Sequence, residues 1–334
     1  MSGANGASGP TLLVASTGGH LEQLMRLRHR LRPLADEVEW VTADDPQSRS
    51  LLEGETVHFL RYVAPRHGEV MLANVPPADR LLRRGGYARV VTTGAAMALS
   101  VLLPASARRI PCHWIESSAR ATGPSLTGRL ASRLPGMQLY AQYPSWATGR
   151  WNFQGSVFDD YTSVPAPGVA AGNIKKVVVT FGTMRTYGFR RAAEAVLRLL
   201  PEIVADNADV LWQVGYTDVS DLPIDGRQSM PAEELRAAVR EADLVIAHAG
   251  VGSALTALDA GRVPVLLTRR QAYDEHVDDH QQMIADELAR RDLAVSCDPD
   301  QLTVEHLMAA AGLAATRRSS SAPFTLVETP RRHR

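Results

Sequence analysis

The chain has 334 residues, of which 45% are apolar and 22% are charged, and its formal net charge is zero. This length predicts two domains with a sizeable core, the apolar content excludes a disordered protein, and two distant cysteines, Cys112 and Cys297, exclude a disulfide scaffold. The neutral charge argues against a general nucleic-acid-binding protein, and the sequence shows no secretory signal and no apolar run of about 18 residues, which predicts a cytoplasmic protein without a membrane-spanning anchor.

The first half begins with a predicted disordered tail at residues 1–10, which are rich in glycine, alanine and serine. An apolar strand follows at 11–16, then a glycine turn and a helix at 20–32, on which leucines recur along one face. Further strands are predicted at 38–43, 88–94, 111–117 and 139–144.

A segment rich in proline, glycine and alanine at 163–172 predicts a linker. The pattern then restarts with a strand at 175–181, a turn at Gly182 and a helix at 189–200. Further strands are predicted at 210–216, 243–248, 263–268 and 293–297. Residues 317–334 show no periodicity and predict a second disordered tail, so the expected domains are 11–162 and 173–316.

Each half therefore opens with a buried strand, a glycine turn and a helix, which is typical of an α/β fold with parallel sheets. We expect two Rossmann-like domains that face each other across a cleft, with ligands at the carboxyl ends of the strands. The halves differ in charge: residues 1–150 carry 17 Arg, no Lys and 11 acidic residues (+6), whereas 151–334 carry 19 basic and 25 acidic residues (−6). This difference favours distinct partners for the two domains.

Three glycine-containing turns, at 16–20, 181–184 and 248–253, each follow a predicted strand. Free N–H groups and the helix dipole at such a turn attract phosphate, although glycine is also the ordinary residue for a tight connection. The P-loop pattern and G-x-G-x-x-G are both absent, which argues against a P-loop NTPase and a dehydrogenase. The only D-x-D string, Asp298 to Asp300, is expected to cap a helix, so no metal cofactor is predicted.

Two sets of segments resemble known glycosyltransferases. The segment HAGVGSALTALDAGRVPVLLTRRQAYDEHVDDHQ (248–281) resembles the donor-binding region of family 28 glycosyltransferases, and VVVTFGT (177–183) resembles the opening strand of the catalytic subunit of the eukaryotic two-subunit member. STGGHLEQLMRL (16–27) and WIESSARATGPSLTGRL (114–130) resemble the partner subunit of that enzyme and its bacterial exopolysaccharide counterparts. The chain thus resembles the two subunits fused.

The resemblance implies the GT-B fold, with a UDP-sugar on the C-terminal domain and the acceptor mainly on the N-terminal domain. It implies donor contacts from Gly182, Thr183, His248, Gly250, Gly252, Ser253, Asp278 and Gln281. For His248 a hydrogen-bonded core histidine is an equal alternative, and for Asp278 and Gln281 an exposed polar loop. Where the family usually has a ribose-binding Glu, this chain has Thr256.

The N-terminal domain is expected to supply the general base and the acceptor site. His20 is the first candidate for the base, because imidazole titrates near neutral pH, and Glu116 is the second. The alternative for Glu116 is an ion pair with Arg120. Gly18, Gly19, Ser125 and Thr127 are expected at the acceptor, although Ser125 and Thr127 are also suited to cap a helix.

A basic segment follows the second predicted strand. Between Arg61 and Arg89 there are six arginines against Glu69 and Asp79, with apolar residues between them. Such a segment predicts peripheral contact with anionic lipid on the inner face of the plasma membrane, or else a solvated amphipathic stretch packed by its leucines.

Together these features predict an inverting, metal-independent transferase that moves a sugar from a UDP-sugar to a polyprenyl-diphosphate-linked glycan in cell-surface polysaccharide synthesis, without nucleic acid as a partner. Two other functions stay open. One is an enzyme like UDP-N-acetylglucosamine 2-epimerase. The other is a non-catalytic nucleotide-sugar-binding subunit of a polysaccharide assembly complex.

Overall fold

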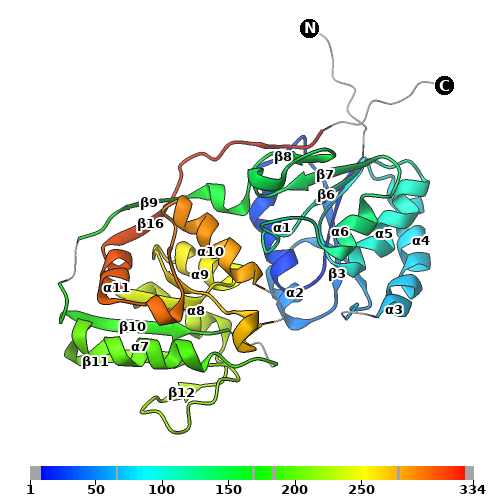
Figure 1. Cartoon of the computed structure of the whole chain (residues 1–334). Helices are drawn as coiled ribbons and strands as arrows, with labels where there is room; N and C mark the ends of the chain where they lie inside the picture. Colours follow the sequence, from blue (N-terminus) through cyan, green and yellow to red (C-terminus); the bar gives the residue numbers. More distant parts are fainter. Residues whose placement is uncertain (1–8, 65–66, 168–169, 183–185, 277–278, 328–334) are drawn as a thin grey trace. The chain divides into compact units, whose positions relative to one another are not determined.

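The computed structural model describes residues 9–64, 67–167, 170–182, 186–276 and 279–327, and these form two compact units (Figure 1). The N-terminal unit consists of Met1–Val157 together with Ser321–Arg334, and the C-terminal unit is Phe158–Ser320. The division thus falls before the linker expected at 163–172, and the last part of the chain belongs to the first unit.

The N-terminal unit contains a seven-stranded parallel sheet in the order β4-β3-β1-β5-β6-β7-β8. Its strands are β1 (Thr11–Ala15), β3 (Val38–Ala43), β4 (Thr56–Leu60), β5 (Arg89–Gly94), β6 (Cys112–Ile115), β7 (Met137–Ala141) and β8 (Trp151–Phe153). Every residue of β1 is buried, because helices cover both faces of the sheet. This burial explains the continuous apolar runs that mark these strands in the sequence.

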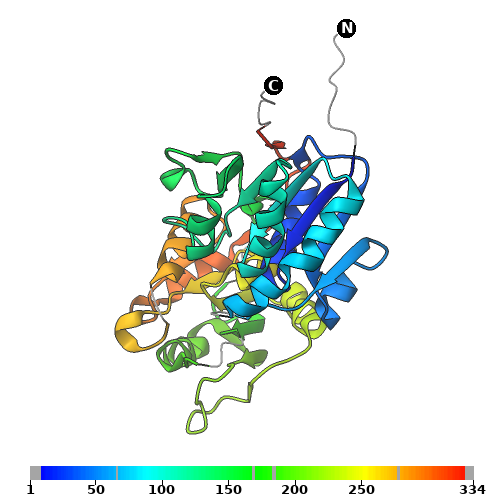
Figure 2. The same cartoon turned by 90° about the vertical axis from the view of Figure 1, so that its right-hand side faces the viewer.

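Six helices accompany this sheet. They are α1 (Gly19–Arg28), α2 (Pro46–Leu51), α3 (Gly68–Ala73), α4 (Val75–Gly85), α5 (Ala96–Ala107) and α6 (Leu126–Ala131). Figure 1 shows α1 on one side of the sheet and α4 and α5 on the other, and in Figure 2 the cyan helices lie in front of the blue strands. The core between α5 and the sheet includes Leu102 and Trp114, both fully buried.

The first helix is shorter than predicted. It ends at Arg28, and Leu31 lies instead in the short strand β2 (Leu31–Arg32), which pairs in parallel with β17 (Phe324–Thr325). Leu31 is buried in that strand, so its place in the leucine pattern does not mean that the helix continues.

The prediction of a disordered tail from residue 317 onward is wrong for the part that the structure describes. Phe324 and Leu326 are almost fully buried, and the Phe324 ring packs edge-on against Tyr140 at 5.3 Å between centroids. Arg30 donates to the carbonyl of Ala322 at 2.9 Å. Residues 321–327 therefore form part of the N-terminal unit.

The C-terminal unit contains a six-stranded parallel sheet in the order β12-β11-β10-β13-β14-β15. Its strands are β10 (Ile174–Thr180), β11 (Val204–Gln213), β12 (Gly226–Arg227), β13 (Leu244–His248), β14 (Val265–Leu267) and β15 (Val295–Cys297). Its helices are α7 (Arg190–Ile203), α8 (Ala232–Glu241), α9 (Val251–Asp259), α10 (His280–Arg290) and α11 (Val304–Ala311). The predicted strands of both halves are confirmed within a few residues at their ends, except that β11 begins at Val204, six residues before the strand predicted at 210–216.

The C-terminal unit begins and ends in one antiparallel pair. Strand β9 (Tyr161–Pro165) pairs with β16 (Leu313–Arg317), from Tyr161 opposite Arg317 to Pro165 opposite Leu313. The first residues of the expected linker therefore lie in a strand of this unit. Within the residues that the structure covers, no helix combines the length and the apolar character needed to pass through a bilayer.

Candidate functional site

In the C-terminal unit, three neighbouring strands end at one edge of the sheet. Strand β13 lies between β10 and β14, so Gly182, His248 and Thr268 follow or end adjacent strands. The carboxyl edge of a parallel sheet is where ligands of such folds bind. We call the residues at this edge, Phe181–Gly182, 248–253 and 268–276, the strand-end site.

His248 fills the space between two glycines of this site. A Cβ atom added at Gly182, whose φ is +74°, would lie 2.7 Å from His248 Cε1, and one added at Gly250 would lie 2.4 Å from Nε2. The Oγ of Ser253 lies 3.3 Å from Nδ1 of the same ring. The glycines at 182 and 250 are thus required by the ring, which keeps the two turns in fixed contact.

The His248 ring is neutral. Burial, and then the positive charge of Arg269, lower the pKa of His248 to about 3. A neutral ring packed between two turns serves as a spacer and not as a cation for phosphate. The structure thus supports the alternative of a hydrogen-bonded histidine at the strand end.

The beginning of α9 has free backbone donors and open space. Gly250 precedes this helix without a side-chain cap, and the first N–H groups of an α-helix have no partner within the helix. Apart from the adjoining backbone of the helix, no described residue lies within 4 Å of a Cβ added at Gly252. An anion can therefore approach these N–H groups closely, and the helix dipole favours it there.

Thr256, on the same helix, is already engaged. Its hydroxyl donates to the Gly252 carbonyl at 2.9 Å. Asp259 accepts from the Tyr161 hydroxyl and from Arg317, and so points towards the β9–β16 pair. The Thr256 hydroxyl and the Asp259 carboxylate are thus both engaged within the protein, and neither takes the place of a ribose-binding Glu.

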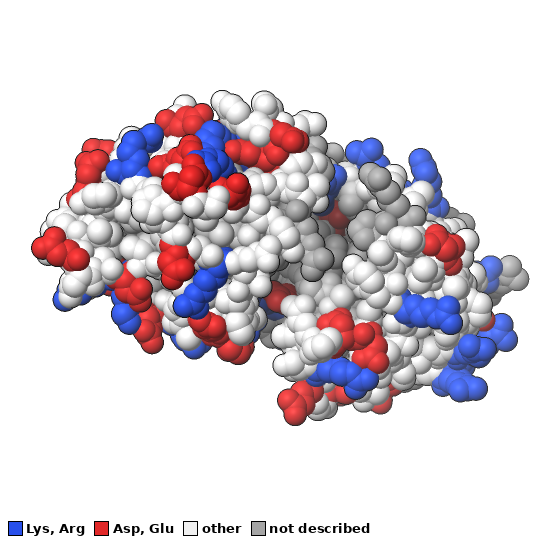
Figure 3. Space-filling view, turned by 90° about the horizontal axis from the view of Figure 1, so that it is seen from below, with Lys and Arg blue, Asp and Glu red and all other residues white. Residues whose placement is uncertain are grey.

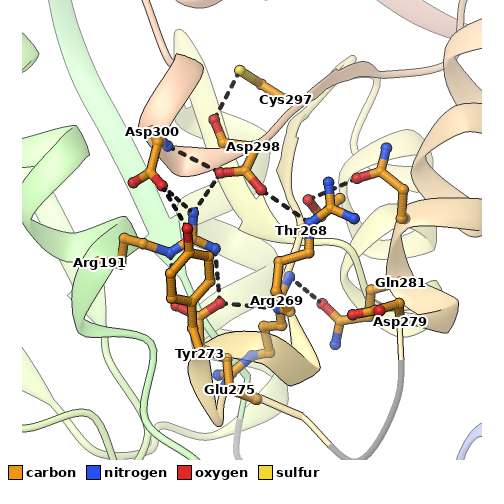
Figure 4. A network of polar contacts seen from close by, with 12 residues as sticks. Arg191, Thr268, Arg269, Tyr273, Glu275, Asp279, Gln281, Cys297, Asp298 and Asp300 are labelled. Atoms are coloured by element: carbon orange, nitrogen blue, oxygen red, sulfur yellow. Dashed lines mark hydrogen bonds and ion pairs between the residues drawn. The ribbon is translucent and has the colours of Figure 1, made fainter.

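The loop after β14 is held by a network of ion pairs around Arg191 (Figure 4). Arg191 of α7 donates to both carboxylate oxygens of Glu275, at 3.1 and 2.9 Å, and forms a further ion pair with Asp298. Arg270 binds the other oxygen of Asp298 at 3.0 Å. Glu275 is buried and fastens the loop to α7, and Arg191 and Arg270 join it to Asp298 after β15.

Gln281 is also buried and engaged, because its Oε1 accepts from the Arg269 backbone N–H at 3.4 Å. Two other predicted donor residues, Thr183 and Asp278, lie outside the described residues. The structure therefore brings Gly182, His248, Gly250, Gly252, Ser253 and Gln281 to one edge of the C-terminal unit.

In the N-terminal unit, His20 lies at the start of α1, beside the end of β5. Its Nδ1 is 2.8 Å from the Thr93 carbonyl oxygen, which can only accept, so Nδ1 carries the proton and Nε2 keeps its lone pair. Burial lowers the pKa of His20, which keeps the ring neutral. Within the part of the chain that the structure covers, and apart from the adjoining backbone, nothing lies within 4 Å of a Cβ added at Gly18, whose φ is +80°, or at Gly19, so there is open space beside this turn.

Glu116 is 1% exposed and binds the start of α6. Its Oε2 accepts from the N–H and the hydroxyl of Ser125, both at 3.2 Å, and from Trp114 Nε1 at 3.2 Å. Burial raises the pKa of Glu116. These contacts, and not an ion pair with Arg120, account for its position.

Ser125 caps α6, because its Oγ accepts from the Gly128 N–H at 3.0 Å. The structure thus has Ser125 in the capping role that was the alternative to acceptor binding. Thr127 Oγ1 lies 3.1 Å from the same hydroxyl. Sequence patterns did not indicate Gln23, which accepts from the Ser118 N–H at 2.9 Å and lies in the same buried polar group. The one feature of the sequence that points to a buried polar role for Gln23 is its position among the leucines of α1.

A basic groove runs along the edge strand β4. Two adjoining pockets of about 600 and 480 Å³ share Phe59, Leu60, Pro77 and Arg80. Arg84 lines the first and Arg61 the second, and in the part of the chain that the structure describes neither Arg80 nor Arg84 pairs with an acidic residue. Figure 3 shows basic side chains gathered at the right-hand edge, over the part of the unit that contains α4.

Comparison with known proteins shows that the C-terminal unit is similar to a family of transferases. Residues 176–322 match the glycosyltransferase family 28 C-terminal domain. The chain is 29% identical over 290 residues to the UDP-N-acetylglucosamine--N-acetylmuramyl-(pentapeptide) pyrophosphoryl-undecaprenol N-acetylglucosamine transferase of Synechococcus sp. (strain RCC307), with 80% of this chain and 78% of the relative covered. The enzyme of the same name from Neisseria gonorrhoeae (strain NCCP11945) is 26% identical over 320 residues, with 89% and 87% covered.

Solved structures show the same fold. MurG of Acinetobacter baumannii aligns with a TM-score of 0.55 at 20% identity, covering 90% of this chain and 88% of that one. The UDP-GlcNAc 2-epimerase from Methanocaldococcus jannaschii aligns with a TM-score of 0.59 at 11% identity, covering 90% and 91%. The expected GT-B fold of two Rossmann-like domains is therefore confirmed.

Proposed function

We propose that this protein is a glycosyltransferase that transfers a sugar from a UDP-sugar to a polyprenyl-diphosphate-linked glycan, because residues 176–322 match the glycosyltransferase family 28 C-terminal domain within a chain that has the GT-B fold. The observation that carries the donor assignment is the free start of α9, with open space at Gly252, at the carboxyl edge of this domain. The relatives that match in sequence are transferases, whereas the epimerase matches at the level of the fold.

The reaction forms a bond between an acceptor oxygen and the anomeric carbon, and it breaks the bond from that carbon to the donor diphosphate. UDP leaves with the electron pair, so negative charge develops on the diphosphate. The N–H groups at the start of α9 are suited to stabilise that charge, and no metal is needed for this step. A base must take the acceptor proton, and the neutral His20, with a free lone pair on Nε2, is suited to do so.

The acceptor is proposed to reach the enzyme at a membrane surface. The basic groove beside β4 is lined by Arg80 and Arg84, which pair with no acidic residue among those that the structure describes, and Leu72 on the neighbouring helix α3 is 60% exposed. Arginine side chains and exposed apolar residues together bind anionic lipid headgroups and the upper acyl region. This supports peripheral attachment to the inner face of the plasma membrane, where a lipid-linked glycan would be presented.

The test is a transfer assay with purified protein, a panel of UDP-sugars and lipid-diphosphate acceptors. We expect UDP release that depends on the acceptor, an elongated lipid-linked product with inverted anomeric configuration, and unchanged turnover in EDTA. Isomerisation of the free UDP-sugar would instead establish the epimerase. UDP binding without turnover on any acceptor would establish a non-catalytic subunit, and loss of turnover in EDTA would overturn the metal-free mechanism.

A matched pair of substitutions tests the donor site by itself. Gly252→Asp places a carboxylate at the start of α9, where we expect it to repel the diphosphate and weaken UDP binding at least tenfold. Gly68→Asp makes the same change in equally open space at the start of α3 and should leave the UDP dissociation constant unchanged. Equal affinities of the two variants in calorimetry would exclude α9 as the diphosphate site.

A further inference from the structure

Arg269, in the loop after β14, is a fully buried cation that binds backbone carbonyls. It is 2% exposed. Its terminal nitrogens donate to the carbonyl oxygens of Phe181 at 3.0 Å, Tyr187 at 3.2 Å, Gly188 at 2.8 Å and Glu275 at 3.1 Å. One guanidinium thus joins both ends of the segment between β10 and α7 to the loop after β14.

This burial of a charge is costly, and no carboxylate among the described residues accepts a hydrogen bond from the guanidinium, although the charge of Glu275 favours it electrostatically. The Glu275 carboxylate accepts from Arg191 and from the backbone N–H of Arg270. Of Glu275, Arg269 binds the backbone carbonyl and not the carboxylate. The Nε of Arg269 is buried without a hydrogen-bond partner among the described residues. Burial lowers the pKa of Arg269 to about 10, so the side chain still carries its charge at neutral pH. Packing alone does not require a charged side chain at this position.

The bound carbonyls determine the direction of the amides that follow them. In a trans peptide the C=O and the next N–H point in opposite directions. Because Arg269 binds the Phe181 oxygen, the Gly182 N–H points away from the guanidinium, and no described residue accepts from it. Gly182 is also the residue whose added Cβ would meet His248, and the His248 ring in turn contacts Gly250 before α9.

We propose that Arg269 is a positioning residue for the donor: by holding the carbonyls of Phe181, Gly188 and Glu275 it turns the Gly182 amide, and not a carbonyl oxygen, towards the diphosphate of the nucleotide-sugar. This inference rests on the proposed function, because it takes the ligand to be a nucleotide-sugar and says that Arg269 affects the binding of its diphosphate. Arg269 does not touch the ligand. It acts through the backbone of the turn after β10.

The positioning role is tested by comparing uridine with UDP, two ligands that differ only in the presence of the diphosphate. Calorimetry would measure the dissociation constants of uridine and UDP for the wild type and for Arg269→Met. We expect Arg269→Met to weaken UDP about tenfold, the equivalent of one lost hydrogen bond to an anion, and to leave uridine nearly unchanged. In turnover assays the KM for the UDP-sugar should rise by a similar factor, with a smaller change in kcat.

Two more variants separate positioning from general loss of stability. Arg291→Met removes a second arginine of the same unit, one that is partly buried and pairs with Asp159 and Glu287. It should lower thermal stability without changing the ratio of the dissociation constants of UDP and uridine. Arg269→Lys keeps the charge but has fewer donors and lacks the fork geometry of arginine, so its dissociation constant for UDP should lie between those of the wild type and Arg269→Met. If Arg269→Met folds poorly, Arg269→Lys serves as the test in its place. Circular dichroism would verify folding of each variant.

The outcomes are distinct. The positioning role would be overturned if both Arg269 variants bound uridine and UDP more weakly by the same factor, or if they bound both ligands as the wild type does. In either case, binding of UDP by the wild type would still support the donor site. Failure of the wild type to bind UDP would overturn the proposed function itself.

Discussion

His20 combines two properties that a general base needs. Its Nδ1 donates to Thr93, which fixes the ring, and its Nε2 is free to accept a proton. We expect His20→Asn to lower kcat by about 100-fold or more, within the range for loss of a general base, while the dissociation constant for UDP stays the same. A kcat within threefold of the wild type, measured at saturating donor and acceptor, would assign the base to another residue.

Buried histidines make the stability of the protein sensitive to acid. Burial lowers the pKa of His113 to about 3, below the 6.5 of an exposed histidine. The unfolded chain therefore binds more protons below pH 6.5, so the stabilising effect of the neutral ring is complete above pH 6.5 and is lost as the pH falls towards 3.

We predict that His113 alone lowers the free energy of unfolding by about 2 kcal/mol between pH 7 and pH 5. Urea unfolding at the two pH values should show a smaller difference for His113→Gln than for the wild type. The exposed residue His67 provides the control, since His67→Gln should keep the wild-type difference. An unchanged difference in His113→Gln would mean that the ring is protonated in the folded protein.

At the scale of single elements, α4 has two functions in one helix. Ala78 and Leu82 are buried against the sheet, while Arg80 and Arg84 face the groove beside β4. We expect Arg80→Glu/Arg84→Glu to abolish flotation with vesicles that contain anionic lipid, because attraction of about 1 kcal/mol per arginine is replaced by repulsion. Transfer to a water-soluble acceptor analogue should be unaffected.

A matched control is the pair Arg198→Glu/Arg240→Glu on α7 and α8 of the other unit, which changes the net charge equally. Equal flotation of the wild type and the α4 variant would show that the groove does not bind lipid.

The sequence predicts some elements well because each carries its own pattern. Strands β1 and β13, and β10 from Val177 onward, contain apolar runs that end in a turn, so the burial of these runs is predicted from composition. The edge strand β4 was not predicted, because it is half exposed and lacks such a run. Helix α5 was not predicted either, since it is apolar nearly all around and shows no helical stripe.

The candidate site divides in the same way. The glycines at 182 and 250 are visible in the sequence, because a turn after a buried strand is a local pattern. The role of Arg269 is not local: its acceptors come from positions 181, 187, 188 and 275, and only the folded chain brings them together. For Glu116 the sequence predicts a base or an ion pair with Arg120, and the bonds that it accepts from Ser125 are not predicted, because Ser125 lies in another element.

At the scale of the whole molecule, the end of the chain stabilises its beginning. Phe324 is fully buried in the N-terminal unit, whereas its neighbour Thr325 is exposed. We expect Phe324→Ala to cost about 3–5 kcal/mol in the unfolding of that unit, while Thr325→Ala costs little. Chemical denaturation monitored by tryptophan fluorescence would measure both, and equal stability of the two variants would contradict the packing of β17.

The pairing of β17 with β2 has a consequence for any attempt to divide this enzyme into two polypeptides. A break between Val157 and Phe158 separates most of the two units, yet it leaves residues 321–327 on the second polypeptide, although they complete the first. The severed pieces would reassociate by fragment complementation, with β17 as the shared strand. A gene split at this point would therefore encode an obligate heterodimer.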